Sequence, residues 1–180
     1  MRAKAAQNGK MTAQQQPEPW LRGTLTGVAA VPRAVLHALE LAREDIFRWC
    51  SGLTDDELNA RPAGIASVAF HIRHIVRSAD CLLTYAEGVQ LTPAQLDAMK
   101  SELDPGATSA TVFSEFNEGI ERSSARIRAI GAGHLEESRK VGRKELPTSV
   151  GGLLVHVADH TQRHVGQAIT TAKLVIAARA

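Results

Sequence analysis

Residues 153–167 read LLVHVADHTQRHVGQ, and they lie inside a longer stretch with the periodicity of a helix. Thr148 or Ser149 is suited to cap the start of this helix. Apolar side chains then recur on what would be one helical face, at Leu153, Val157, Val165, Ile169 and Leu174. The stretch predicts a long amphipathic helix that must bury this face against other helices.

Three further segments share this pattern, at residues 32–50, 67–88 and 108–130. Shorter helical pieces are expected after Thr54 and between Thr92 and Lys100, and residues 134–147 are expected to form a loop with a little extended structure. No segment shows convincing strand alternation. The sequence therefore predicts an all-α fold, a four-helix bundle, in which the long connection between the second and third helices indicates something other than simple up-down order.

The composition indicates one domain. The chain has 180 residues, 44% of them hydrophobic, which is enough for a single sizeable core. We expect the bundle to span residues 20–180 and residues 1–19, which are polar and rich in Gln and Ala, to be a poorly ordered tail. The net charge of +2 is spread along the chain, so neither nucleic acid nor an anionic membrane is expected as a partner.

The compartment is predicted from what the sequence lacks. It has no apolar run typical of a signal peptide, and none near the roughly 20 residues of a membrane span. Cys50 and Cys81 are too few for a disulfide framework or a thiolate zinc cage, so we expect buried free thiols. These features favour the cytoplasm.

Five of the seven histidines fall in two short windows, and this clustering is the main functional signal. His160 and His164 are four residues apart, so a helix places both imidazoles on one face. His74, on a second helix, is the candidate third ligand. Three neutral imidazoles suit a divalent transition metal such as nickel, zinc or iron, with coordination positions left open.

Other histidine pairs are also at helical spacing. His71 precedes His74 by three residues, and His156 precedes His160 by four. Successive histidines four apart rotate by about 40° around a helix, so the outer two of His156, His160 and His164 diverge by about 80° and cannot easily meet one ion. We prefer His160 and His164, nearer the kink expected at Gly166-Gln167. His71, His156 and Gln167 become candidates for a pocket or for contacts with the ligands.

Two metal chemistries are disfavoured. A carboxylate-bridged di-iron bundle needs Glu-x-x-His pairs, and the sequence contains none. A zinc protease needs His-Glu-x-x-His, whereas residues 160–164 read HTQRH, without the glutamate that serves as general base. Histidines that only form hydrogen bonds in a core remain an alternative to any metal site.

Two passages resemble the DinB-like superfamily of bacterial four-helix bundles, which includes YfiT-like metal hydrolases and relatives of bacillithiol and mycothiol transferases. Residues 67–80, SVAFHIRHIVRSAD, are similar to the family's second helix, and His160 to Gln167 resembles its His-x3-His followed by Gly-Gln. The resemblance places the metal ligands on His74, His160 and His164. Val165 stands where the family often has arginine, so no role is transferred to Arg163.

The resemblance implies a metal at one end of a bundle that is often dimeric. It implies either transfer of a low-molecular-weight thiol to another small molecule or hydrolysis, because a metal can activate a bound thiol or water. We expect a small-molecule substrate and a homodimer. A non-catalytic, metal-binding or dimerising bundle with a stress-response role is the alternative, and the catalytic residues are not identified by the sequence.

Overall fold

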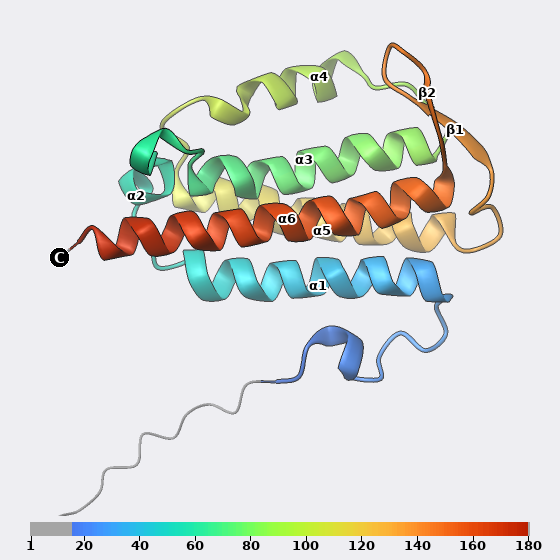
Figure 1. The fold of residues 1–180 in the computed structure, drawn as a ribbon, viewed down its shortest axis with the longest axis horizontal. Helices are drawn as coiled ribbons and strands as arrows, with labels where there is room; N and C mark the ends of the chain where they lie inside the picture. The colour runs from blue at the N-terminus through green and yellow to red at the C-terminus, as the bar shows by residue number, and fades with distance from the viewer. Residues whose placement is uncertain (1–15, 180) are drawn as a thin grey trace, which may run out of the picture.

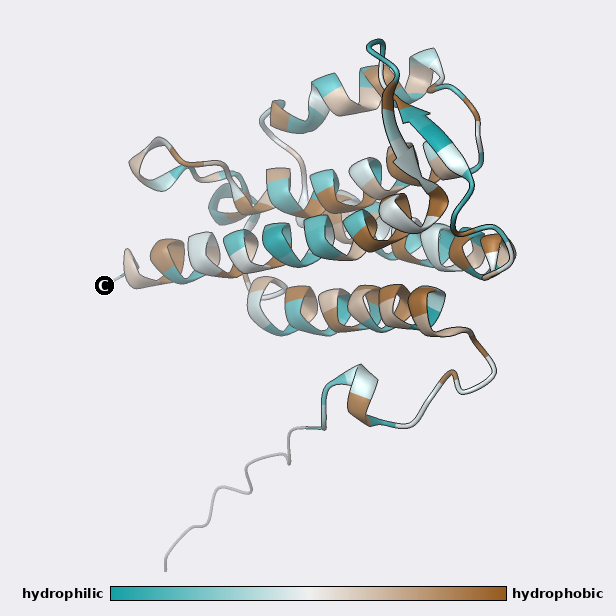
Figure 2. Cartoon of the chain, turned by 45° about the vertical axis from the view of Figure 1, so that its right-hand side comes forward, coloured by the Kyte–Doolittle hydropathy of each residue, from teal (hydrophilic) through white to brown (hydrophobic). Residues whose placement is uncertain are grey.

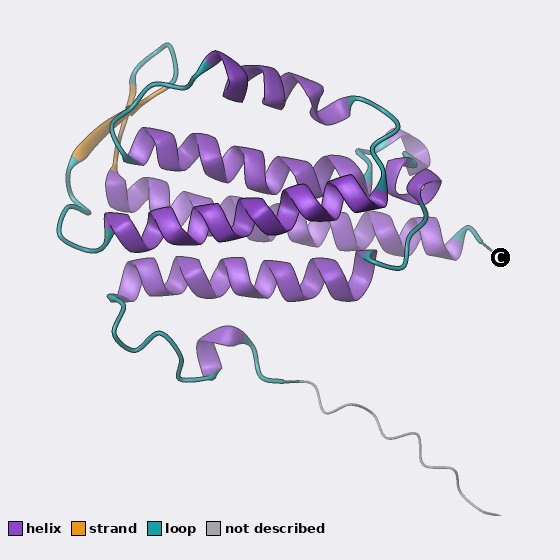
Figure 3. Ribbon diagram, turned by 180° about the vertical axis from the view of Figure 1, so that it is seen from behind, coloured by secondary structure: helices purple, strands orange, loops and turns teal. Residues whose placement is uncertain are grey.

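The computed structural model describes residues 16–179. Helices dominate this part of the chain, and a single small two-stranded sheet accompanies them (Figure 3). The predicted all-α class is thus confirmed at the level of secondary structure. Within the described residues, none of the helices combines the length and the hydropathy needed to cross a membrane.

Four long helices lie side by side: α1 (Ala30–Cys50), α3 (Val68–Ala86), α5 (Ser109–Ile130) and α6 (Val150–Ala177) (Figure 1). α6 packs against α1 and α3, and α5 packs against the same two helices. Figure 2 shows apolar and polar residues alternating along these helices, as amphipathic helices require. Each of the four contributes large and fully buried side chains, among them Leu39, Ile46, Ile72, Ile75, Leu83, Val112, Phe116, Ile127 and Leu154.

The order of the helices is not simple up-down-up-down. α3 and α5 run in the same direction, and α1 and α6 run opposite to them (Figure 1). Two parallel neighbours cannot be joined by a short turn, so the chain returns along the outside of α3. This return segment, residues 87–108, contains α4 (Pro93–Lys100) and the 3-10 helix η3 (Ser101–Leu103).

Side-chain caps fix the starts of most helices where the sequence predicted them. The hydroxyls of Ser67, Thr108 and Ser149 each accept a hydrogen bond from the backbone three residues later, at the starts of α3, α5 and α6. Thr54 forms a capping box at α2 (Asp55–Asn59), and Thr92 forms another at α4. α1 begins at Ala30, two residues before the predicted Pro32, without a side-chain cap.

Residues 134–149 contain the expected extended structure as an antiparallel hairpin of β1 (Ser138–Val141) and β2 (Leu146–Ser149). Ahead of α1, the 3-10 helix η1 (Pro19–Leu21) leads to Arg22, which forms an ion pair with Glu44 at 2.6 Å. Most of the predicted tail, residues 1–15, lies outside the described residues. Cys50 and Cys81 are free and buried, as predicted.

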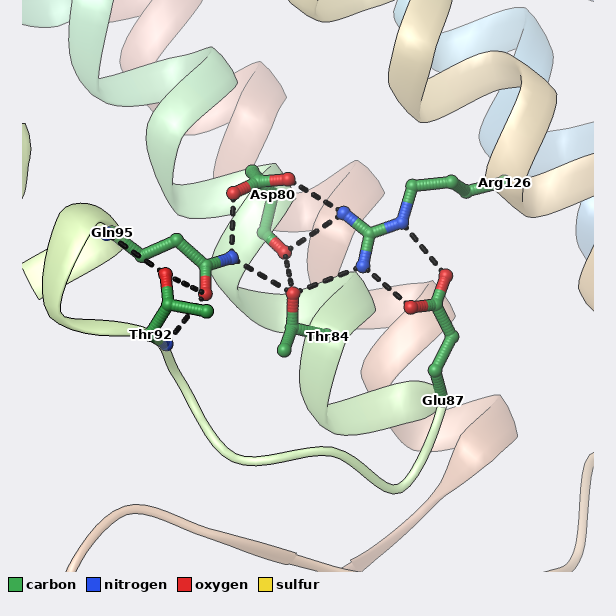
Figure 4. A network of polar contacts seen from close by, with 6 residues as sticks. All are labelled: Asp80, Thr84, Glu87, Thr92, Gln95 and Arg126. Atoms are coloured by element: carbon green, nitrogen blue, oxygen red, sulfur yellow. Dashed lines mark hydrogen bonds and ion pairs between the residues drawn. The ribbon is translucent and has the colours of Figure 1, made fainter.

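The return segment is attached to the long helices by polar contacts (Figure 4). α4 contributes no buried residue. Instead, Gln95 Nε2 donates to Asp80 Oδ2 at 2.6 Å and to Thr84 Oγ1 at 2.8 Å. Arg126 of α5 donates to Asp80 Oδ1 at 2.6 Å and to both carboxylate oxygens of Glu87. Asp80 thus joins α3, α4 and α5.

The other end of α4 is held by Arg77. Its guanidinium donates to the carbonyl of Ala98 and to Ser101 Oγ at 3.0 Å, and it also pairs with Glu115 of α5. These bonds fix the position of η3 against α3. The next residue, Glu102, is consequently held in the interior, where it is only 5% exposed.

α3 and α5 approach each other closely at Gly119. A Cβ atom at this position would lie 2.4 Å from Cβ of Val76, much closer than two carbon atoms can pack. Glycine normally weakens a helix interior, by roughly 1 kcal/mol relative to alanine. Here the close packing of the two helices requires it.

We predict that Gly119→Ala destabilises the protein despite its better helix propensity. The added methyl group must push against Val76, and overpacking of this kind costs about 1–3 kcal/mol. Urea unfolding measures the change. Val76→Gly, which removes the Cβ atom that the new methyl group meets, should recover part of the loss in the Gly119→Ala background, giving strong non-additivity in the double-mutant cycle. Additive effects would contradict the proposed contact.

Candidate metal centre

His160 and His164 lie one turn apart on α6, with ring centroids 4.5 Å apart. His74 faces them from α3, its centroid 5.0 Å from that of His160 and 4.5 Å from that of His164. One ring nitrogen from each residue lies within 4.8 Å of one from each of the others. The packing of α3 on α6 therefore brings together the three histidines that the spacing selected.

The nitrogen of His74 that faces this group is identified by its other contact. His74 Nδ1 lies 2.8 Å from Glu102 Oε2, and a carboxylate accepts such a bond. Nδ1 therefore donates, and the lone pair of the ring is on Nε2. That atom lies 2.9 Å from His160 Nε2. A carboxylate that holds one nitrogen of a histidine while the other is free for a metal is a common arrangement in metalloproteins.

His164 has a comparable partner in His71. The Nδ1 atoms of these two residues are 3.0 Å apart, so one ring donates to the other. If His164 donates, its Nε2 is free for an ion, and His71 carries its own proton on Nε2. His71 is 5% exposed. The structure thus places the predicted pocket residue His71 in contact with a candidate ligand.

Burial keeps these imidazoles neutral at neutral pH. It lowers the pKa of His71 to about 4, with nearby His74 adding to the effect. Burial is also the main cause that lowers the pKa of His160 to about 4 and that of His164 to about 3, again with a contribution from His74. A neutral imidazole has a lone pair to offer, so the shifts suit metal binding.

A buried carboxylate oxygen supports the fit of a cation. Glu102 Oε1 and His160 Nδ1 have no hydrogen-bond partner in the part of the chain that the structure describes. Isolated buried carboxylates are costly, because the charge has lost its water. A divalent ion held by the three imidazoles would place positive charge near Glu102, so the residues present fit such an ion.

The other predicted residues lie farther out. His156 is exposed and lies 3.7 Å from Asp159, and its ring centroid is 5.4 Å from that of His160. It does not join the group, consistent with the divergence of histidines along one helix. Gln167 is exposed and lines a cavity next to His71. α6 runs through Gly166 and Gln167 as one continuous helix.

Sequence reasoning missed Glu102. It lies in the connecting stretch between the second and third helices, 28 residues from its partner His74. No local pattern links the two, because their contact depends on the path of the return segment. The only available signal would have been an acidic residue in a connection that must run alongside the histidine-bearing helix.

Fold and site together define an all-α protein with a half-buried three-histidine group supported by a carboxylate. The sequence matches the DinB superfamily over residues 38–168, which covers more than half of the chain and includes Glu102 and all three histidines. The chain belongs to this superfamily, as the resemblance indicated. A comparison with curated proteins finds no match.

We predict that Glu102→Gln lowers the affinity for metal by about 10- to 100-fold, the usual effect of losing such a supporting contact. The amide keeps the size of the side chain but removes its charge. Isothermal titration with zinc or nickel measures the affinity. Glu136→Gln, which changes an exposed carboxylate, is the matched control. Equal affinities in both variants would exclude a supporting role for Glu102.

We also predict that the metal-free protein loses stability as the pH falls from 6.5 towards 4. In this window the unfolded chain binds protons on His71, His160 and His164, whereas the folded chain keeps them neutral. Lowering the pH stabilises the state that binds more protons, which is the unfolded state, so the free energy of unfolding must fall. Urea unfolding in the presence of a chelator measures it. The variant lacking His74, His160 and His164 should show a shallower dependence, and identical profiles would contradict the buried neutral histidines.

Proposed function

We propose that this protein is a metal-dependent enzyme built on a four-helix bundle, with one divalent transition metal held by His74, His160 and His164. The convergence of their ring nitrogens within 4.8 Å carries the proposal. Membership of the DinB superfamily supports it. Nickel, zinc and iron all accept imidazole ligands, so the site suits each of them.

A three-histidine metal leaves coordination positions open, and when bound there it would lower the pKa of a thiol or a water molecule to give a nucleophile at neutral pH. Around it, Glu102 keeps the proton on His74 Nδ1 and so directs Nε2 to the centre. His71 contacts His164 Nδ1, and when His164 donates to it, Nε2 of His164 is likewise directed to the centre. We infer that a small thiol is transferred to another small molecule, or that water hydrolyses one.

The protein's own thiols are unsuited to act as the nucleophile. Burial raises the pKa of Cys50 to about 12 and that of Cys81 to about 11, so both stay protonated at neutral pH. An attacking thiol must therefore come from a separate molecule. This favours a low-molecular-weight thiol as substrate over a covalent cysteine intermediate.

The alternative is a metal-binding, dimerising bundle without catalysis, with a stress-response role. One observation favours it. Among the described residues, Glu102 is the carboxylate that contacts this group, and its Oε2 is taken up by the bond to His74. A separate acid or base for proton transfer is not evident.

Elemental analysis of the untagged protein tests the metal site. We expect about one ion per chain in the parent and none in the folded variant His74→Ala, His160→Ala, His164→Ala, because its ligands are gone. A control variant, His134→Ala with His156→Ala, removes two exposed histidines and should keep the metal. A parent that stays metal-free after reconstitution with zinc, nickel or iron would refute the site.

Thermal unfolding with a panel of small thiols separates the two functions. If a thiol binds the metal, it should raise the unfolding temperature of the metal form and leave the metal-free form unchanged, since a ligand stabilises only the state that binds it. If no thiol changes the unfolding temperature of the metal form, the proposed thiol transfer is refuted. Sedimentation measurements on the same samples test the expected homodimer.

A further inference from the structure

A cavity of about 650 Å³ lies beside the three-histidine group. It is formed where the segment before α3, at Ile65 and Ala66, meets the C-terminal half of α6. Its volume is within the range of natural small-molecule sites. His71 lines the cavity and also contacts His164, so one side chain joins the cavity to the candidate ligands.

Two of the residues that line this cavity are polar and buried. His71 is 5% exposed and Thr171 is 2% exposed, and both line its wall. His71 bonds to His164 through Nδ1, so Nε2 is the ring nitrogen that remains for a ligand.

Gly166, at an exposed position of α6, leaves the wall of the cavity without a side chain. It lies within α6, where glycine is among the least favourable residues. No neighbouring atom lies within 4 Å of the place a Cβ would occupy. Unlike Gly119, it is therefore not required by helix packing. A larger residue here would extend into the cavity that Gly166 lines.

The lining also indicates the kind of ligand. Ile65 and Ala66 provide apolar wall, and Arg163 is the charged residue among those that line the cavity. Arg163 donates to Asp159 through Nη2 at 2.8 Å, which leaves its other donors for a second acceptor. An apolar wall with one guanidinium suits a molecule with an apolar body and a single carboxylate.

We propose that this cavity binds the second reactant of the metal site, a small monocarboxylate with an apolar body. The assignment of it as a reactant rests on the proposed function, whereas its binding does not require the metal. The carboxylate contacts Arg163, and the body lies over Gly166 towards His71. The reacting end is thereby placed next to His164.

Isothermal titration with 4-phenylbutyrate, and with its uncharged amide as comparison, tests the cavity. The parent should bind the acid more tightly than the amide. Gly166→Leu fills the cavity and should weaken binding of both by about tenfold or more. Its urea midpoint should stay equal or rise, because leucine favours the helix, so weaker binding cannot be ascribed to unfolding. Ala177→Leu, at an exposed position of the same helix, is the matched control and should bind as the parent does.

Arg163→Gln tests the charge. It should weaken binding of the acid and leave that of the amide unchanged, so that the two affinities become similar. Failure of the parent to bind the acid at millimolar concentration, or unchanged binding in Gly166→Leu, would overturn the proposal. So would an Arg163→Gln variant that still prefers the acid.

The same titrations in the variant lacking His74, His160 and His164 separate the two proposals. Binding there, together with a parent that takes up no metal, would refute the metal function and leave the cavity site standing. A parent that holds metal yet fails to bind the acid would refute the cavity alone.

Discussion

The parallel course of α3 and α5 is the constraint on which the rest of the structure depends. Because these neighbours run in the same direction, the chain must travel back along the outside of α3 before α5 can begin. That return path passes the histidine-bearing face of α3. It brings Glu102 into the interior beside His74, so a topological requirement also supplies the carboxylate of the site.

The electrostatics of the site follow from its burial between helices. The half-buried imidazoles of His160 and His164 lose part of the water that would stabilise their charged forms, so they remain neutral. Glu102 is an acidic side chain in the same interior, with one oxygen that lacks a partner among the described residues. Neutral imidazoles with free lone pairs next to a buried carboxylate would be stabilised by a cation, whereas an ordinary apolar core would not.

Most of the helices could be predicted from the sequence because their signals are local. Ser67, Thr108 and Ser149 act through backbone groups three residues away, and the apolar periodicity needs only one turn of context. The pair His160 and His164 was visible for the same reason. Choosing His74 as their partner required the expectation that two helices pack against each other. That expectation came from the clustering of the histidines and from the family resemblance.

The remaining features depend on contacts between distant segments. The bond from Glu102 to His74 and the contact of His71 with His164 exist only once the helices are packed. The role of Gly166 was also hidden, since a glycine in a helical pattern indicates a weak point, and α6 nevertheless continues through it. That Gly166 lines a cavity can be seen only in the packed structure, where no atom lies near its Cβ position.

The way in which α4 is attached has a consequence for the dynamics of the fold. A helix without buried side chains has little hydrophobic free energy to hold it, so its local opening requires less free energy than opening of the core helices. In hydrogen exchange, the amides of residues 93–103 should therefore form a cooperative unit distinct from α3. Because Glu102 belongs to that unit, each opening also removes the support of His74 while the long helices stay packed. The lifetime of the intact site is then set by the least stable segment of the chain around it.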